Sequence, residues 1–216
     1  HSFPTRRSSD LNCDTWTLAS RGEYHWGTNP NSQSLRDFYL WTCQKALEKF
    51  GNDGFYYDFA TVVGVDNPAS GCGYERDGKR YRTWPIFADR AMRRAIYEMV
   101  MDKRGHAMFV YHNYSQIIAP ITSFATMILD GEPYQQRTGV IGVKITSDFT
   151  KLIPLSRLKT MFGVQFGTVP CLLVKFPNEA ISTPEIRKAT RTVTALALPH
   201  GVPVWGFYCD IQELNR

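Results

Sequence analysis

Short apolar runs alternate with longer amphipathic segments along most of this chain. The amphipathic segments repeat apolar residues at the spacing of one helix face, and residue types favoured at helix ends flank them. One example is Thr183-Pro184-Glu185, where Thr183 is a typical helix cap and Pro184 a typical first helical residue. The predicted helices cover residues 34–50, 83–104, 116–124 and 183–198.

Short runs with strand character lie between these helices. Strands that alternate with helices indicate parallel pairing, because a parallel neighbour is reached only through a crossover connection. The segment 60–83 is rich in Gly, Asn and charged residues and is expected to be a long loop. The predicted strands are 55–59, 108–111, 126–129, 170–175 and 202–207, with a partial strand near 15–19.

Polar residues gather directly after the predicted strands, as they do in a (β/α)8 barrel, where the carboxyl ends of the strands converge on one active face. We therefore predict an α/β fold that is the C-terminal part of a (β/α)8 TIM barrel, with its N-terminal strands missing. An open doubly wound sheet is the alternative, because the crossover from Asn113 to Asp130 is short and contains Pro120. The polar residues are Asp58, His112, Asn113, Asp130, Glu132, Cys209 and Asp210.

Composition narrows the class of protein further. Hydrophobic residues make up 43% of the 216 residues and charged residues 21%, which excludes collagen-like, coiled-coil and disordered chains. The net charge of +5 is scattered along the chain without a basic block, so we predict no nucleic-acid partner. No apolar run is long enough to cross a membrane. The chain also lacks the glycine-rich nucleotide motifs, the G-x-S-x-G nucleophile motif and any C-x-x-C pair, so no cofactor is predicted.

Residues 1–11 are expected not to belong to the natural protein. Translation of a common short-read sequencing adapter gives the peptide HSFPTRRSSDL. We therefore take residues 12–216 as the partial barrel domain of a metagenomic fragment whose true N-terminus is missing. Its compartment stays open, with a secreted or periplasmic protein as one possibility.

Carboxylates at strand ends are the first candidates for chemistry. Asp58 ends one predicted strand, and Asp130 and Glu132 follow another. Glycoside hydrolysis usually needs two carboxyl groups, about 5 Å apart for retention of configuration and about 6.5–9.5 Å apart for inversion. The alternative is that Asp58 only caps a turn and that Asp130-Gly131 is turn chemistry.

Aromatic residues near strand ends and in loops suit a sugar ligand, because their flat apolar faces pack on the C–H face of a pyranose. The side chains of His112-Asn113-Tyr114-Ser115 can hydrogen-bond sugar hydroxyls. Core packing is the alternative for about half of the aromatic residues, with Tyr56 and Trp205 first. The predicted substrate-binding residues are Trp26, Tyr57, His112, Asn113, Tyr114 and Tyr134, and Tyr111 and Trp205 are further aromatic candidates.

A metal site built from Asp58, His112, Asp130 and Glu132 is conceivable, since hard cations bind carboxylate oxygens. The sequence has no H-E-x-x-H motif or other paired-histidine spacing, and no metal is predicted.

Several short motifs resemble uncharacterised bacterial proteins described as glycoside hydrolase family 123-like. The similarity spans most of residues 52–210. Such proteins are usually much longer, with a β-sandwich before a catalytic barrel, so the resemblance implies that this chain is a barrel fragment. The motifs are Asp53-Gly54-Phe55-Tyr56-Tyr57-Asp58-Phe59, Gly71-Cys72-Gly73-Tyr74, Asp77-Gly78-Lys79, Trp84-Pro85-Ile86, Ile128-Leu129-Asp130-Gly131-Glu132 and Leu198-Pro199-His200-Gly201-Val202-Pro203-Val204-Trp205.

The resemblance implies hydrolysis of glycosidic bonds in a polysaccharide, oligosaccharide or glycoconjugate. Characterised family members act on N-acetylgalactosaminides through an adjacent Asp-Glu pair, with the substrate's acetamido group as nucleophile. This chain has no adjacent Asp-Glu, so neither that mechanism nor that substrate is carried over. The placement of Asp58 at a strand end, with a carboxylate two strands later, also resembles retaining α-galactosidase-like barrels.

These observations predict a glycosidase without a cofactor. Asp58 is expected to be the nucleophile or the stabiliser of an oxocarbenium ion, and Glu132 the acid/base. Asp130 is expected either to substitute for Glu132 or to bind a substrate hydroxyl. The alternatives are a carbohydrate-binding barrel without catalysis and a metal-dependent hydrolase or isomerase.

Overall fold

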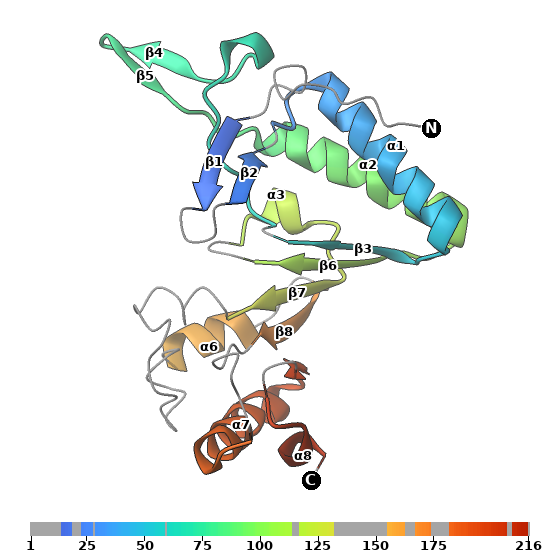
Figure 1. The fold of residues 1–216 in the computed structure, drawn as a ribbon, viewed down its shortest axis with the longest axis vertical. Helices are drawn as coiled ribbons and strands as arrows, with labels where there is room; N and C mark the ends of the chain where they lie inside the picture. The colour runs from blue at the N-terminus through green and yellow to red at the C-terminus, as the bar shows by residue number, and fades with distance from the viewer. Residues whose placement is uncertain are drawn as a thin grey trace. The chain divides into compact units, whose positions relative to one another are not determined.

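The structure of the chain is a computed structural model (Figure 1). Within the strands Asp14–Leu18 and Glu23–Gly27 only the backbone is described, so the side chain of Trp26 is outside the description. Tyr114, Glu132 and Tyr134, and the adapter-like residues 1–11, also lie outside it. The described residues are 14–18, 23–27, 29–58, 60–113, 117–131, 155–162, 167–173, 182–206 and 209–215.

The chain divides into two compact units that exchange segments along the sequence. The first comprises His1–Phe55, Thr61–Ala107 and Ile118–Phe124, and the second comprises Tyr56–Ala60, Met108–Ile117 and Ala125–Arg216.

Two long helices form the centre of the first unit. The helix α1 buries Leu35 and Leu47, and α2 buries Ile96 and Val100, so each helix packs an apolar face inward. The guanidinium of Arg104, in the last turn of α2, donates a 2.8 Å hydrogen bond to the backbone oxygen of Leu47 near the end of α1. The helices are α1 (Gln33–Phe50), α2 (Ile86–Arg104) and α3 (Ala119–Thr122).

The partial strand predicted near 15–19 is present, but it does not join the parallel sheet. The strand β1 (Asp14–Leu18) instead pairs with β2 (Glu23–Gly27) in a separate antiparallel hairpin.

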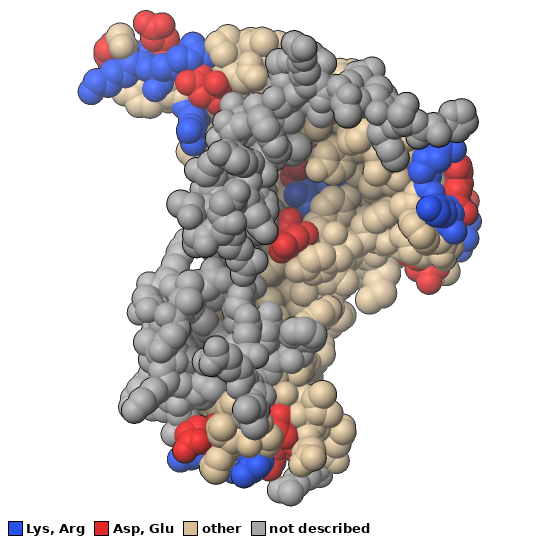
Figure 2. Space-filling view, in the orientation of Figure 1, with Lys and Arg blue, Asp and Glu red and all other residues tan. Residues whose placement is uncertain are grey.

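The long loop expected over 60–83 is interrupted by a second hairpin. The strands of this hairpin are β4 (Tyr74–Arg76) and β5 (Lys79–Tyr81). A 3-10 turn, η2 (Pro68–Ser70), precedes them in the chain. Asp77 and Gly78 form the two-residue turn, with φ angles of 52° and 68°. Both strands are exposed on each side, so they carry none of the hydrophobic alternation from which a strand is predicted. Figure 2 shows Lys and Arg side chains gathered over this hairpin.

A five-stranded sheet runs through the second unit, and it confirms the α/β class. Its strand order, β3-β6-β7-β8-β9, follows the order of the strands in the chain, and β6 to β9 pair in parallel. All five strands predicted from the sequence for this sheet are present, although β9 is shorter than expected. Their bounds are β3 (Gly54–Tyr57), β6 (Met108–His112), β7 (Met127–Asp130), β8 (Val169–Leu173) and β9 (Val204–Trp205).

Helices cover one side of this sheet. Leu172 of β8 is fully buried and packs against residues of α6 (Leu155–Phe162) and α7 (Pro184–Ala197). We call this side the helix face. The opposite side, which we call the His112 face, carries an apolar cluster because side chains alternate along each strand. That cluster contains Leu129, Cys171 and Leu173, with Val110 and Met127 packed against it.

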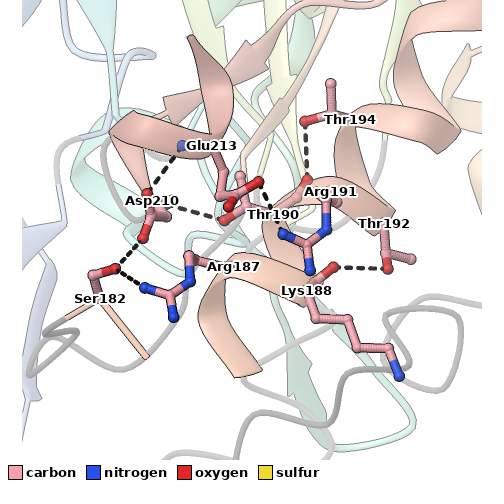
Figure 3. Close-up of polar contacts among 9 residues, drawn as sticks. All are labelled: Ser182, Arg187, Lys188, Thr190, Arg191, Thr192, Thr194, Asp210 and Glu213. Carbon is pink, nitrogen blue, oxygen red and sulfur yellow. Dashed lines mark hydrogen bonds and ion pairs between the residues drawn. The ribbon is translucent and has the colours of Figure 1, made fainter. Parts of the chain in front are cut away.

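A polar network fixes the C-terminal segment onto α7 (Figure 3). The carboxylate of Asp210 accepts the backbone N–H of Glu213 at 3.0 Å and so caps α8 (Ile211–Leu214). The same carboxylate accepts a short hydrogen bond from the hydroxyl of Ser182, and the backbone N–H of Asp210 donates to Thr190 Oγ1 at 3.0 Å. Asp210, named above among the strand-end polar residues, is therefore a capping residue.

This network makes a pH-dependent contribution to stability. The Ser182 hydroxyl, as the largest cause, lowers the pKa of Asp210 in the folded protein. A lowered folded-state pKa stabilises the protein above the unfolded pKa of about 3.9, and the contribution is lost as pH falls further. We expect Ser182→Ala to be destabilising at neutral pH, and its difference from wild type to shrink below about pH 4. Denaturant unfolding at several pH values measures this.

Thr183→Ala is the matched control for Ser182→Ala. Thr183 Oγ1 accepts the backbone N–H of Ile186 at 3.2 Å and caps α7 without a titrating partner. Its loss should cost about 1 kcal/mol at every pH. Equal pH profiles for the two variants would contradict the role given to Asp210.

Candidate functional site

An exposed carboxylate and a buried imidazole meet at the ends of β3 and β6. Asp58 Oδ1 lies 2.7 Å from His112 Nδ1. The Asp58 side chain is 58% exposed, whereas that of His112 is only 7% exposed. The hydroxyl of Tyr56 donates a longer hydrogen bond, 3.4 Å, to the same carboxylate oxygen. The carboxylate is therefore held at a fixed place while it stays open to solvent.

Strand geometry explains why these three side chains meet. Tyr56 and Asp58 are two residues apart, so both project to the same side of the extended chain. His112 is the last residue of β6, and its backbone oxygen accepts the N–H of Ala60 at 2.8 Å. This bond ties the chain that follows Asp58 to the end of β6. The ring of Tyr56 lies 6.3 Å from that of His112.

The strand register places the side chains of Asp58 and Asp130 on opposite sides of the sheet. His112 is paired with Leu129, the residue before Asp130, so Asp130 projects to the other side of the sheet. Asp130 is paired with Leu172 and shares the helix face with it. The carboxylates of Asp58 and Asp130 therefore lie on opposite faces.

Asp130 instead takes part in a buried polar pair with Asn113. Asp130 is 4% exposed and Asn113 is 2% exposed, and Asn113 Nδ2 donates a hydrogen bond to Asp130 Oδ2 at 3.1 Å. The other carboxylate oxygen, Oδ1, accepts the backbone N–H of Gly131 at 2.7 Å. The Asp130 carboxylate therefore accepts hydrogen bonds at the turn after β7, from Asn113 and from the backbone of Gly131. This agrees with the alternative given above, in which Asp130-Gly131 is turn chemistry.

The aromatic residues are distributed differently from the prediction. Tyr57 lies on the side of Phe109 and Tyr111 and packs on both rings, with centroids 5.9 and 5.0 Å away. Tyr56 and Trp205, assigned first to the core, are 51% and 43% exposed. Trp205 is paired with Leu173 and therefore belongs to the His112 face. Tyr57 thus packs on neighbouring aromatic rings, whereas the exposed Tyr56 lies on the side of Asp58, as the two-residue period of a strand predicts.

The side chains of four predicted site residues lie outside the described part of the structure. Glu132, Tyr114 and Tyr134 fall outside the described residues, and of Trp26 only the backbone is described, paired with Thr15 in the first hairpin. They stay predictions.

Three of the cysteines in the described region carry thiols of low reactivity. Burial raises the pKa of the Cys43, Cys171 and Cys209 thiols to about 11, so all three are protonated at neutral pH. A protonated thiol is a poor nucleophile and a poor metal ligand. Among the described side chains, no three His, Cys, Asp or Glu gather into a group that could hold a metal ion.

The chain matches no protein-family model, and no curated protein is significantly similar to it. Within the described part of the chain, no helix has the length and apolar composition that a membrane span requires.

Proposed function

We propose that this chain is the C-terminal part of a (β/α)8 barrel that hydrolyses glycosidic bonds in a polysaccharide, oligosaccharide or glycoconjugate. One observation carries the proposal: a solvent-accessible carboxylate, Asp58, is held by the buried ring of His112 at the ends of two strands. The resemblance of the surrounding motifs to family 123-like glycoside hydrolases agrees with this chemistry.

The sheet supports the barrel part of the proposal. A barrel adds each strand beside the one before it, whereas a doubly wound sheet reverses direction at a switch point. In this sheet the strands follow chain order without reversal, and α6 and α7 pack on one face. In a closed barrel of this kind the His112 face would line the interior, and Asp58 would lie at its rim.

Asp58 is suited to act as a nucleophile or as the stabiliser of an oxocarbenium ion. A carboxylate only accepts hydrogen bonds, so His112 Nδ1 and the Tyr56 hydroxyl both donate to it. These donors fix the direction of the carboxylate, and its exposed side can reach the anomeric carbon of a bound sugar. His112 is a positioning residue here, because its ring is buried behind the carboxylate.

Glu132 is proposed as the acid/base that protonates the leaving oxygen. Asp130 is a poor candidate for this role, because it lies on the helix face with hydrogen bonds to Asn113 and Gly131. The turn that Asp130 and Gly131 form after β7 leads directly into Glu132.

The proposal is tested by incubating the full-length protein with a panel of neutral and acidic polysaccharides and measuring the release of new reducing ends. Release of defined oligosaccharides, insensitive to a chelator, is the expected result. Binding without cleavage would replace the proposal with a carbohydrate-binding barrel. Cleavage that a chelator abolishes and a divalent metal restores would replace it with a metal-dependent hydrolase.

A further inference from the structure

We propose that the β4–β5 hairpin is a binding arm for an acidic polysaccharide, that is, a chain of sugars carrying carboxylate or sulfate groups. This inference deepens the proposed function and rests on it for the statement that the bound polysaccharide is also the substrate. The binding itself depends on one face of the hairpin.

Two tyrosines and two cations share that face. In the hairpin Tyr74 is paired with Tyr81, and Arg76 with Lys79. Pairs two positions apart along a ribbon project to the same side, so all four side chains lie together. We call this side the tyrosine face. All four residues are exposed, with Tyr74 at 48% and Tyr81 at 40%.

The other side of the hairpin differs in its electrostatics. It carries Glu75 and Arg80, and the Arg80 guanidinium forms an ion pair with Asp66 at 2.5 Å. On the tyrosine face, Lys79 forms no ion pair with any residue of the described region. Within the described part of the chain, the one ion pair of Arg76 is with Asp77 of the turn, at 3.6 Å, and both side chains are exposed to water. Positive charge is therefore left available on the same side as the two rings.

The hairpin is held in a fixed shape. Its base is an antiparallel bridge, in which Val65 and Thr83 exchange backbone hydrogen bonds of 2.8 and 2.9 Å. Gly73 has a φ of +84°, and a Cβ atom there would lie 2.2 Å from Asp66 Oδ1, so a larger residue would be strained and would displace the Asp66 carboxylate. A preformed arm loses little conformational entropy when a ligand binds.

The ring geometry favours a sugar chain over a single-stranded nucleic acid. The rings of Tyr74 and Tyr81 stack on each other, with centroids 5.2 Å apart and planes 17° apart. Their inner faces are thus occupied, and no base can stack between them as it does on the aromatic platforms of nucleic-acid-binding proteins. An outer ring face beside a cation suits a sugar whose C–H face is flat and whose substituent is an anion.

The test measures binding of the full-length protein to polygalacturonate by affinity electrophoresis and calorimetry, with fully methyl-esterified polygalacturonan as the uncharged counterpart. We expect binding to the acidic form, and an affinity for the esterified form about tenfold lower at low salt. Tyr74→Ala/Tyr81→Ala and Arg76→Gln/Lys79→Gln should each weaken binding about tenfold. A heparin-type sulfated glycan in a parallel assay distinguishes sulfate from carboxylate as the recognised group.

Matched variants distinguish a specific role of the tyrosine face from a general effect of lost positive charge. Tyr74→Phe/Tyr81→Phe keeps the rings and should restore most of the binding. Lys159→Gln/Lys188→Gln removes the same charge from exposed positions of α6 and α7 and should bind like wild type. Equal losses in the two charge variants, or tighter binding of oligo(dT) than of either glycan, would overturn the inference.

Different experimental results would contradict the proposed function and the further inference. If the variants of the tyrosine face bind like wild type while the protein still cleaves polysaccharide, the inference is wrong and the proposed function stands. If binding depends on the tyrosine face but no glycosidic bond is ever cleaved, the hairpin is a binding arm and the proposed function is wrong.

Discussion

Replacing Asp58 by Asn is expected to lower kcat about 10³-fold on a confirmed glycoside substrate, with little change in the unfolding transition. The amide keeps the shape of the side chain but removes the negative charge that would attack or stabilise the anomeric carbon. Stability should change little, because the Asp58 side chain is 58% exposed. Steady-state kinetics of the full-length variant, with circular dichroism to check folding, measures both effects.

Asp130→Asn is the matched control for Asp58→Asn. Both substitutions remove one carboxylate at the end of a strand, but Asp130 is buried on the helix face and accepts two hydrogen bonds. We expect Asp130→Asn to lower the free energy of unfolding by about 1–3 kcal/mol and to leave kcat per folded molecule within a few-fold of wild type. The assignment of Asp58 is wrong if its variant keeps the wild-type kcat or if the two variants exchange these phenotypes.

Gly131→Ala is expected to lower the free energy of unfolding by about 3 kcal/mol or more. Gly131 has a φ of +125°, which side chains rarely adopt, and its backbone passes close to β8. A Cβ atom would lie 2.6 Å from the backbone oxygen of Leu173 and 3.0 Å from Leu172 Cδ1. Because the obstacle is backbone, it cannot be relieved by a rotamer change. Guanidinium unfolding followed by circular dichroism measures the loss.

Gly201→Ala separates the steric effect from backbone strain. Gly201 also has a positive φ, +64°, but no atom lies within 4 Å of a Cβ placed there. Only the left-handed backbone conformation then costs energy, about 1 kcal/mol. If the two variants were equally stable, the close approach between β7 and β8 would not be what requires glycine at 131.

Local sequence signals predicted most of the regular structure in this chain. The capping residue Thr183 and the glycine at 51 both stand where the helices begin and end. The short helices α6 and α8 were not predicted. The β4–β5 hairpin was missed because both of its faces meet water.

The candidate site was predicted only in part. Asp58 and His112 were found because each follows or ends an apolar strand, and parallel strands bring their carboxyl ends together. A two-residue period places Tyr56, and not Tyr57, on the side of Asp58. The placement of Asp58 and Asp130 on opposite faces could not be predicted from a period within one strand, because it depends on the register between strands.

The sequence by itself determined which residues form the strands and helices, and which side chains share a side within each strand. Those are properties of neighbours along the chain, fixed by backbone geometry and by local burial. Only the tertiary structure decided that His112 is paired with Leu129 rather than with Asp130. A shift of one residue between strands moves every side chain to the opposite face, and the register between strands depends on packing across the whole sheet.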